Sequence, residues 1–212
     1  MNRFEQALAE CPVLVADGAM GTTLFSLGLE SGGCPEFLNV ERPGLVADVH
    51  RRFVAAGSDL VLTNTFGGNA RRLALHGASH RVGELNRAAV ELAREAVGDA
   101  VVVAGSVGPT GDLLAPLGPL SHDAATEVFA EQVDALAGAG ADVIWIETLS
   151  SLDELGAAVT AAAVSGLPVA ATLSFDTAGR TMMGVSGQAL ADWTRTDGRV
   201  AAVGANCGIG PG

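Results

Sequence analysis

The chain contains no lysine and no tyrosine, and all 12 of its basic residues are arginine. Schiff-base chemistry and the anchoring of pyridoxal phosphate both require a lysine amine, so these chemistries are excluded. A Walker-type phosphate loop also requires lysine and is excluded for the same reason. Because there is no phenol, acid–base catalysis by tyrosine is excluded as well.

Other features that the chain lacks restrict its location and its partners. Its three cysteines are odd in number and widely spaced, which argues against a disulfide framework and favours a reducing compartment. There is no signal-peptide core at the N-terminus, and no stretch approaches the ~20 apolar residues that span a bilayer. The net charge of -12 opposes binding to nucleic acids and to anionic membranes. We therefore expect a cytoplasmic protein with small-molecule partners.

What the chain does contain is a regular alternation of short apolar runs with longer helical patterns. Near-continuous apolar runs are typical of parallel strands that are buried on both faces. The expected strands are Val13–Ala16, Leu60–Thr63, Val101–Ala104, Val143–Ile146, Val169–Leu173 and Val200–Gly204. The expected helices are Gly44–Ala56, Arg81–Val97, Ala124–Ala139, Ser151–Ser165 and Gln188–Arg195.

These roughly six βα units are predicted to form one α/β domain over residues 1–212, because no polar linker divides them. A doubly wound sheet and a (β/α)8 TIM barrel both fit the pattern. The barrel is favoured because every expected strand ends in a polar or glycine-rich loop, and such a barrel takes about 250 residues. We therefore expect an open ring, truncated after about six units. Since open strand edges pair with other chains, we also expect aggregation or a homo-oligomer.

Two acids follow expected strands. Asp17 begins the run Asp17-Gly-Ala-Met-Gly-Thr22, and Glu147 ends the run Ile144-Trp-Ile-Glu-Thr148. At the carboxyl ends of barrel strands, the two would face each other as an acid–base pair or as a clamp for an ammonium group. The alternatives are an Asx-type turn for Asp17 and a solvated loop acid for Glu147.

A cysteine follows the last expected strand. Cys207 ends the run Val200-Ala-Ala-Val-Gly-Ala-Asn-Cys207, where it would be a nucleophile or one ligand of a metal. A thiolate zinc site needs three or four ligands, so one thiol is an incomplete site. The other cysteines are not expected to act in catalysis: Cys11 is predicted to be structural, and Cys34 to be a free buried thiol. His76 and His80 are predicted to lie on the surface. His50 and His122 are predicted to lie at helix starts or on outer faces.

Five motifs in order along the chain resemble the homocysteine S-methyltransferase family. They are Asp17-Gly-Ala-Met-Gly-Thr, Thr63-Asn-Thr-Phe-Gly, Gly105-Ser-Val-Gly-Pro-Thr-Gly, Ile146-Glu-Thr-Leu and Gly204-Ala-Asn-Cys-Gly. The resemblance implies a (β/α)8 barrel that holds Zn2+ through three cysteine thiolates and transfers a methyl group to homocysteine, forming methionine.

By the same resemblance, Cys207 matches the first zinc ligand, and Asp17 and Glu147 match positions that bind the amino group of homocysteine. It assigns no separate catalytic residue. The other two zinc ligands are adjacent cysteines in a downstream Gly-Gly-Cys-Cys-Gly motif, which this sequence does not contain. Two alternatives are therefore kept: an incomplete, non-catalytic barrel that binds an amino acid or a partner protein, and a metal-independent enzyme with Cys207 as its nucleophile.

Overall fold

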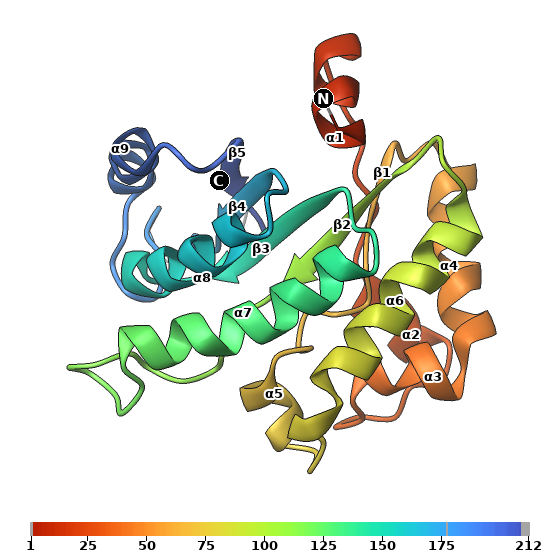
Figure 1. The fold of residues 1–212 in the computed structure, drawn as a ribbon, viewed down its shortest axis with the longest axis horizontal. Helices are drawn as coiled ribbons and strands as arrows, with labels where there is room; N and C mark the ends of the chain where they lie inside the picture. The colour runs from red at the N-terminus through yellow and green to blue at the C-terminus, as the bar shows by residue number, and fades with distance from the viewer. Residues whose placement is uncertain (1, 177, 209–212) are drawn as a thin grey trace.

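Five parallel strands form one curved sheet with the order β1-β2-β3-β4-β5 (Figure 1). The structure, a computed structural model, describes residues 2–176 and 178–208. The strands are β1 (Leu60–Leu62), β2 (Val102–Val107), β3 (Val143–Leu149), β4 (Val169–Leu173) and β5 (Ala202–Ala205). The α-helices are α1 (Arg3–Glu10), α2 (Met20–Ser26), α3 (Leu38–Glu41), α4 (Pro43–Ala55), α5 (Ala70–Ala74), α6 (Val82–Val97), α7 (His122–Gly138), α8 (Leu152–Val164) and α9 (Gly187–Asp197). Two 3-10 turns, η1 (Pro35–Phe37) and η2 (Ser79–Arg81), complete the described elements.

The strand order identifies the architecture. Each strand pairs with its neighbour in sequence, and helices α4, α6, α7 and α8 follow one another along one face of the sheet (Figure 1). A doubly wound sheet would reverse its strand order and carry helices on both faces. The arrangement is that of consecutive units of a (β/α)8 barrel, which confirms the predicted fold class.

Successive residues of each strand pack on opposite faces of the sheet. Val61 and Val103 belong to the large cluster beneath the outer helices. Leu60 and Val102 belong to a smaller cluster on the inner face, which the buried ring of Phe4 from α1 joins. An ion pair of 2.6 Å between the Arg3 guanidinium and the Asp142 carboxylate holds α1 at the amino end of the sheet. The carboxyl end is left for the polar loops.

The predicted strand at Val13–Ala16 is wrong. This segment makes a single parallel bridge, from Ala16 to Leu60, and no strand. Val13 and Val15 expose 72% and 51% of their surfaces, so the side away from β1 has no packing partner among the described residues. The run is apolar, as predicted, but its pairing with β1 is limited to this bridge and the few backbone hydrogen bonds around it. Self-association through such edges stays a prediction.

The other five strands and the five predicted helices are present, with ends that differ by a few residues. Gly57, Gly98, Gly140 and Gly166 have positive φ just past helix ends, a conformation that favours glycine. The sequence analysis missed α1, although Asn2 and Glu5 form a capping box at its start. No helix in the described part of the chain is both long and apolar enough to cross a bilayer.

The predicted outer position of His50 is also wrong. His50 lies in α4 with 0% of its surface exposed, and neither ring nitrogen has a hydrogen-bond partner among the described residues. Burial disfavours the charged imidazolium and lowers the pKa of His50 to about 4.

Candidate functional site

A cavity of about 770 Å³ opens at the carboxyl end of the sheet. Residues that follow different strands line it, as expected for the mouth of a βα barrel. Asp17, Glu147 and Cys207, the three residues singled out from the sequence, all line this one cavity. The structure therefore brings together segments that are up to 190 positions apart in the sequence.

Asp17 is half-buried directly after the bridge to β1. Its carboxylate accepts a hydrogen bond of 3.1 Å from the backbone N–H of Leu62, a residue of the neighbouring strand and not of its own turn. Burial raises the pKa of Asp17 to about 7, against the opposing effect of the Leu62 N–H, and the negative charge of Glu147 raises it further. The two carboxylates thus interact across the cavity.

Glu147 lies near the end of β3 and is held from two sides. The Ser106 hydroxyl donates a hydrogen bond of 2.6 Å to one carboxylate oxygen, and the Asn206 amide donates one of 3.2 Å to the other. Burial raises the pKa of Glu147, and the bond from Ser106 opposes this shift. Two partly desolvated carboxylates therefore line one cavity, and a cation bound between them would relieve their repulsion.

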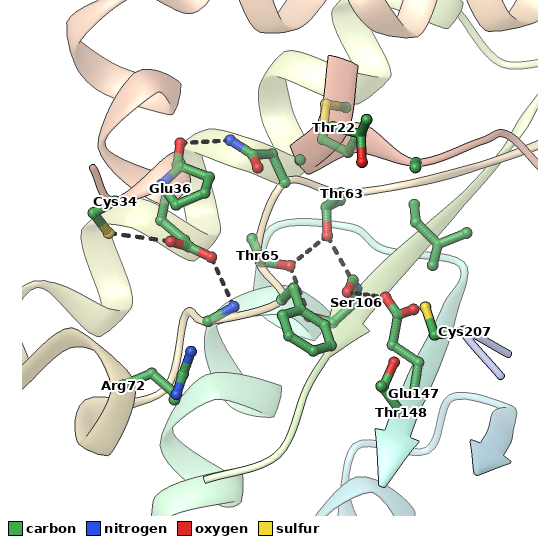
Figure 2. Close-up of a pocket in the computed structure, with 18 of the residues that line it drawn as sticks. Thr22, Cys34, Glu36, Thr63, Thr65, Arg72, Ser106, Glu147, Thr148 and Cys207 are labelled. Atoms are coloured by element: carbon green, nitrogen blue, oxygen red, sulfur yellow. Dashed lines mark hydrogen bonds between the residues drawn. The ribbon is translucent and has the colours of Figure 1, made fainter. Parts of the chain in front are cut away.

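Cys207 presents an exposed thiol beside Glu147 (Figure 2). Asn206 links Glu147 and Cys207, because its amide donates to Glu147 and lies 3.4 Å from the Cys207 sulfur. The same amide also donates to the Thr148 hydroxyl at 2.7 Å. Thr148 and Cys207 both have left-handed backbone, with φ of 64° and 51°. Non-glycine residues in this conformation are uncommon and collect at functional sites.

Asn206 and Ser106 were not predicted as parts of this site. Ser106 lies in the motif that begins at Gly105, and Asn206 directly precedes the candidate thiol. The signal that was available is position, since polar side chains at the ends of buried strands point into the mouth of a barrel.

Thr63 and Thr65, in the Thr63-Asn-Thr-Phe-Gly segment, hydrogen-bond to the backbone of Ser106. The Thr65 hydroxyl donates to the Ser106 carbonyl at 2.7 Å, and the Ser106 N–H donates to the Thr63 hydroxyl at 3.0 Å. Gln132 of α7 donates to the Thr65 carbonyl at 2.8 Å. This buried network fixes the backbone of Ser106 and, through its hydroxyl, the orientation of Glu147.

At the other end of the cavity lie Cys34, Glu36 and Arg72 (Figure 2). The Cys34 thiol donates a hydrogen bond of 3.1 Å to Glu36. Burial and the adjacent Glu36 charge raise the pKa of Cys34 to about 12. Cys34 is therefore the free buried thiol that was predicted.

Cys11, His76 and His80 all lie at the surface. Cys11 is exposed at the end of α1. His76 and His80 are exposed, as predicted, although His76 also borders the cavity.

The described residues alone do not fit a zinc ion. Within 2–176 and 178–208, no group of three His, Cys, Asp or Glu side chains is arranged to hold a metal. Cys207 offers one thiolate, and the second thiol on the cavity, Cys34, is bound to Glu36. A zinc site at Cys207 would need ligands besides these residues.

The chain is similar to known proteins both in sequence and in structure. The sequence profile described as homocysteine S-methyltransferase matches residues 14–211. The methionine synthase of Mycobacterium leprae (strain TN) is 33% identical, over 94% of this chain and 18% of that protein. That of Mycobacterium tuberculosis (strain ATCC 25618 / H37Rv) is 34% identical over the same shares. The chain thus spans about a fifth of the length of these relatives.

Solved structures give the same result. The metallated form of the homocysteine methyltransferase MmuM from Escherichia coli superimposes with a TM-score of 0.83 at 26% identity, over 97% of this chain and 78% of that one. The oxidized form gives 0.82 at 27% identity, over 98% and 77%. The match over nearly the whole chain, together with the cavity described above, leads to one conclusion. This chain belongs to the homocysteine S-methyltransferase family.

Proposed function

We propose that this chain binds homocysteine and takes part in the zinc-dependent transfer of a methyl group to its thiol, forming methionine. The observation that carries the proposal is the meeting of Asp17, Glu147 and Cys207 in one cavity of a chain of this family. Homocysteine carries an ammonium group at one end and a thiol at the other. A pair of carboxylates beside a thiol provides a matching arrangement.

The carboxylates are assigned to binding and not to proton transfer. Burial raises the pKa of Glu147, while Ser106 and Asn206 both donate to its carboxylate and hold it in place for a cationic partner. Asp17, with a pKa of about 7, is ionised above neutral pH, and an ammonium group between the two would relieve their repulsion. We expect Asp17 and Glu147 to fix the amino group of the substrate and thereby to orient its sulfur.

The transfer itself forms one bond and breaks one. The homocysteine sulfur forms the new S–CH3 bond while the bond from the methyl carbon to the donor breaks, and the electron pair stays with the departing atom. The donor is a sulfonium, a quaternary ammonium or a cobalt-bound methyl group, and the thiol proton passes to solvent. A free thiol has a pKa of ~8.5 and is mostly protonated at neutral pH, although the thiolate is the nucleophile.

Zinc, when bound, would make the substrate thiolate available at neutral pH. Cys207 is the residue of this chain assigned to that ion, in a role that needs further ligands. The residues of the chain are expected to act by positioning: Asn206 holds Glu147 and Cys207 relative to each other, and Ser106 orients Glu147.

A second candidate is a barrel that binds homocysteine or another amino acid without catalysis. The observation in its favour is that the described residues contain no three-ligand metal group. The two candidates share the ammonium clamp and differ in what happens at the sulfur.

The test combines zinc content with methionine formation. The purified chain is supplied with zinc, homocysteine and a methyl donor of each class, and methionine is measured by mass spectrometry. Methionine formation that is lost in Cys207→Ser supports methyl transfer. Homocysteine binding without methionine, with no effect of Cys207→Ser, favours the non-catalytic candidate. A failure to bind homocysteine contradicts the proposed methyl transfer, and a failure to bind any amino acid contradicts both candidates.

A further inference from the structure

Arg72 of α5 is a cation without a partner on the wall of the cavity. It is half-buried and lines the cavity, yet its guanidinium makes no hydrogen bond or ion pair with any other residue of 2–176 and 178–208. The adjacent Arg71 differs on every point, because it is exposed, lies outside the cavity lining and binds the Asp112 carboxylate at 2.6 Å.

Arg72 lies at the opposite end of the cavity from the candidate site. Figure 2 shows Thr65 and Ser106 between Arg72 and the pair Glu147 and Cys207. A ligand with its ammonium group at Glu147 has its carboxylate on the same carbon as that group. The carboxylate of homocysteine is therefore expected to stay near Glu147, and Arg72 is left for a different anionic group.

Glu36, which lies at the same end of the cavity, does not pair with Arg72. One oxygen of Glu36 accepts the Gly67 N–H at 2.7 Å, and the other accepts the Cys34 thiol at 3.1 Å. The stem of Arg72 packs against Gly111, where an added Cβ would come within 3.2 Å of its Cδ and Nη1. The stem thus lies close to the Gly111 backbone on one side, while the charge has no partner among the described residues.

We propose that Arg72 is an anion subsite that binds the carboxylate of the methyl donor, a small compound with both a methylated cationic centre and a carboxylate. This rests on the proposed function, which places homocysteine at the other end. The cavity of about 770 Å³ lies in the range that holds a drug-sized ligand, which is more than one small amino acid needs. A guanidinium binds a carboxylate through two parallel hydrogen bonds.

The charges of the cavity would also orient such a donor. Its carboxylate would be attracted to Arg72, and its methylated cation would be attracted to the end that carries Asp17 and Glu147. That orientation directs the methyl group toward the thiol of homocysteine, as in-line transfer requires. Donors that lack the carboxylate would lose this alignment.

The experiment measures binding by isothermal titration calorimetry at pH 8, where Asp17 is ionised. The probes are trimethylglycine, S-methylmethionine, tetramethylammonium as the match without a carboxylate, and homocysteine. The variants are Arg72→Met, which keeps the apolar stem, and Arg71→Met as the matched neighbour outside the cavity. Circular dichroism checks that each variant is folded.

We expect Arg72→Met to weaken binding of at least one of the two carboxylated donors tenfold or more, and to leave tetramethylammonium and homocysteine within about twofold. Arg71→Met should change none of them. The subsite is refuted if neither carboxylated donor binds the wild type, or if Arg72→Met leaves their affinities unchanged. An equal loss of homocysteine affinity in Arg72→Met would also refute it, because Arg72 would then bind the first substrate.

The outcomes separate the two proposals. If homocysteine does not bind the wild type while Arg72 still discriminates between carboxylated and uncarboxylated probes, the proposed function fails and the subsite stands. If homocysteine binds and the Arg72 effect is absent, only the subsite fails.

Discussion

Replacing Glu147 with glutamine should remove one charge from the ammonium clamp and change little else. The Ser106 hydroxyl can rotate, so it can accept from the new amide nitrogen, while the amide oxygen still accepts from Asn206. Both supports of the side chain are therefore retained. The loss is confined to the charge that would face the substrate ammonium.

The size of the effect follows from that loss. A hydrogen bond to a charged group contributes about 1.5–3 kcal/mol, which corresponds to about 10- to 100-fold in affinity. The Glu147 charge also raises the pKa of Asp17 from its ordinary value, so its removal should lower that pKa below about 7. In the wild type, homocysteine affinity should fall as the pH drops through about 7. In Glu147→Gln, the same fall should occur at lower pH.

Isothermal titration with homocysteine from pH 6 to 8.5 measures both effects. Glu91→Gln, an exposed position on α6, is the control and should match the wild type at every pH. Unchanged homocysteine affinity in Glu147→Gln at pH 8 would refute the clamp. Loss of turnover at unchanged affinity would refute it too, because a catalytic proton transfer would then be required.

Three further predictions concern the rest of the chain. The pKa of His50 is about 4 when folded and about 6.5 when unfolded, so stability is full above pH 6.5 and is lost as the pH falls toward 4. Urea unfolding should show the wild type losing about 2 kcal/mol more than His50→Leu between pH 7 and 4.5, and equal losses would contradict the buried neutral imidazole. At pH 8, iodoacetamide should modify exposed Cys207 much faster than buried Cys34, because burial raises the pKa of Cys34 to about 12. Peptide mapping measures the two rates, and equal rates would show that Cys34 is not buried. Dialysis against a chelator should strip zinc from the chain, since no three-ligand group exists among the described residues, and stoichiometric zinc by mass spectrometry would disprove this.

Much of the fold could be predicted because buried parallel strands leave a strong local signal. The runs that became β2, β3 and β4 are almost wholly buried, and their apolar character fixes them without further context. Val13–Ala16 has the same apolar character, but Val13 and Val15 are exposed, and an apolar run that is not buried on both faces was not held as a strand. His50 was misplaced because it is polar, although its spacing of four residues from Val46 puts it on the buried face of α4.

The site was predictable where a side chain sits at the end of a strand. Asp17, Glu147 and Cys207 were found in this way, and the structure brings them to one cavity. Arg72 was not predicted, because α5 is a short helix with no strand-end signal. Only the position of Arg72 in the folded chain shows that its guanidinium lines the cavity without a partner among the described residues. The position of Asn206 after the last strand could have placed it at the site, but its link to both Glu147 and Cys207 is shown only by the distances between them.

The ammonium group of homocysteine is proposed to bind at Asp17 and Glu147, with the sulfur directed toward Cys207. A crystal structure of the chain soaked with homocysteine would show this arrangement. We expect the substrate nitrogen within hydrogen-bond distance of both Asp17 and Glu147, and the sulfur facing Cys207. Homocysteine bound in the reverse direction, or outside this cavity, would disprove the proposed binding mode.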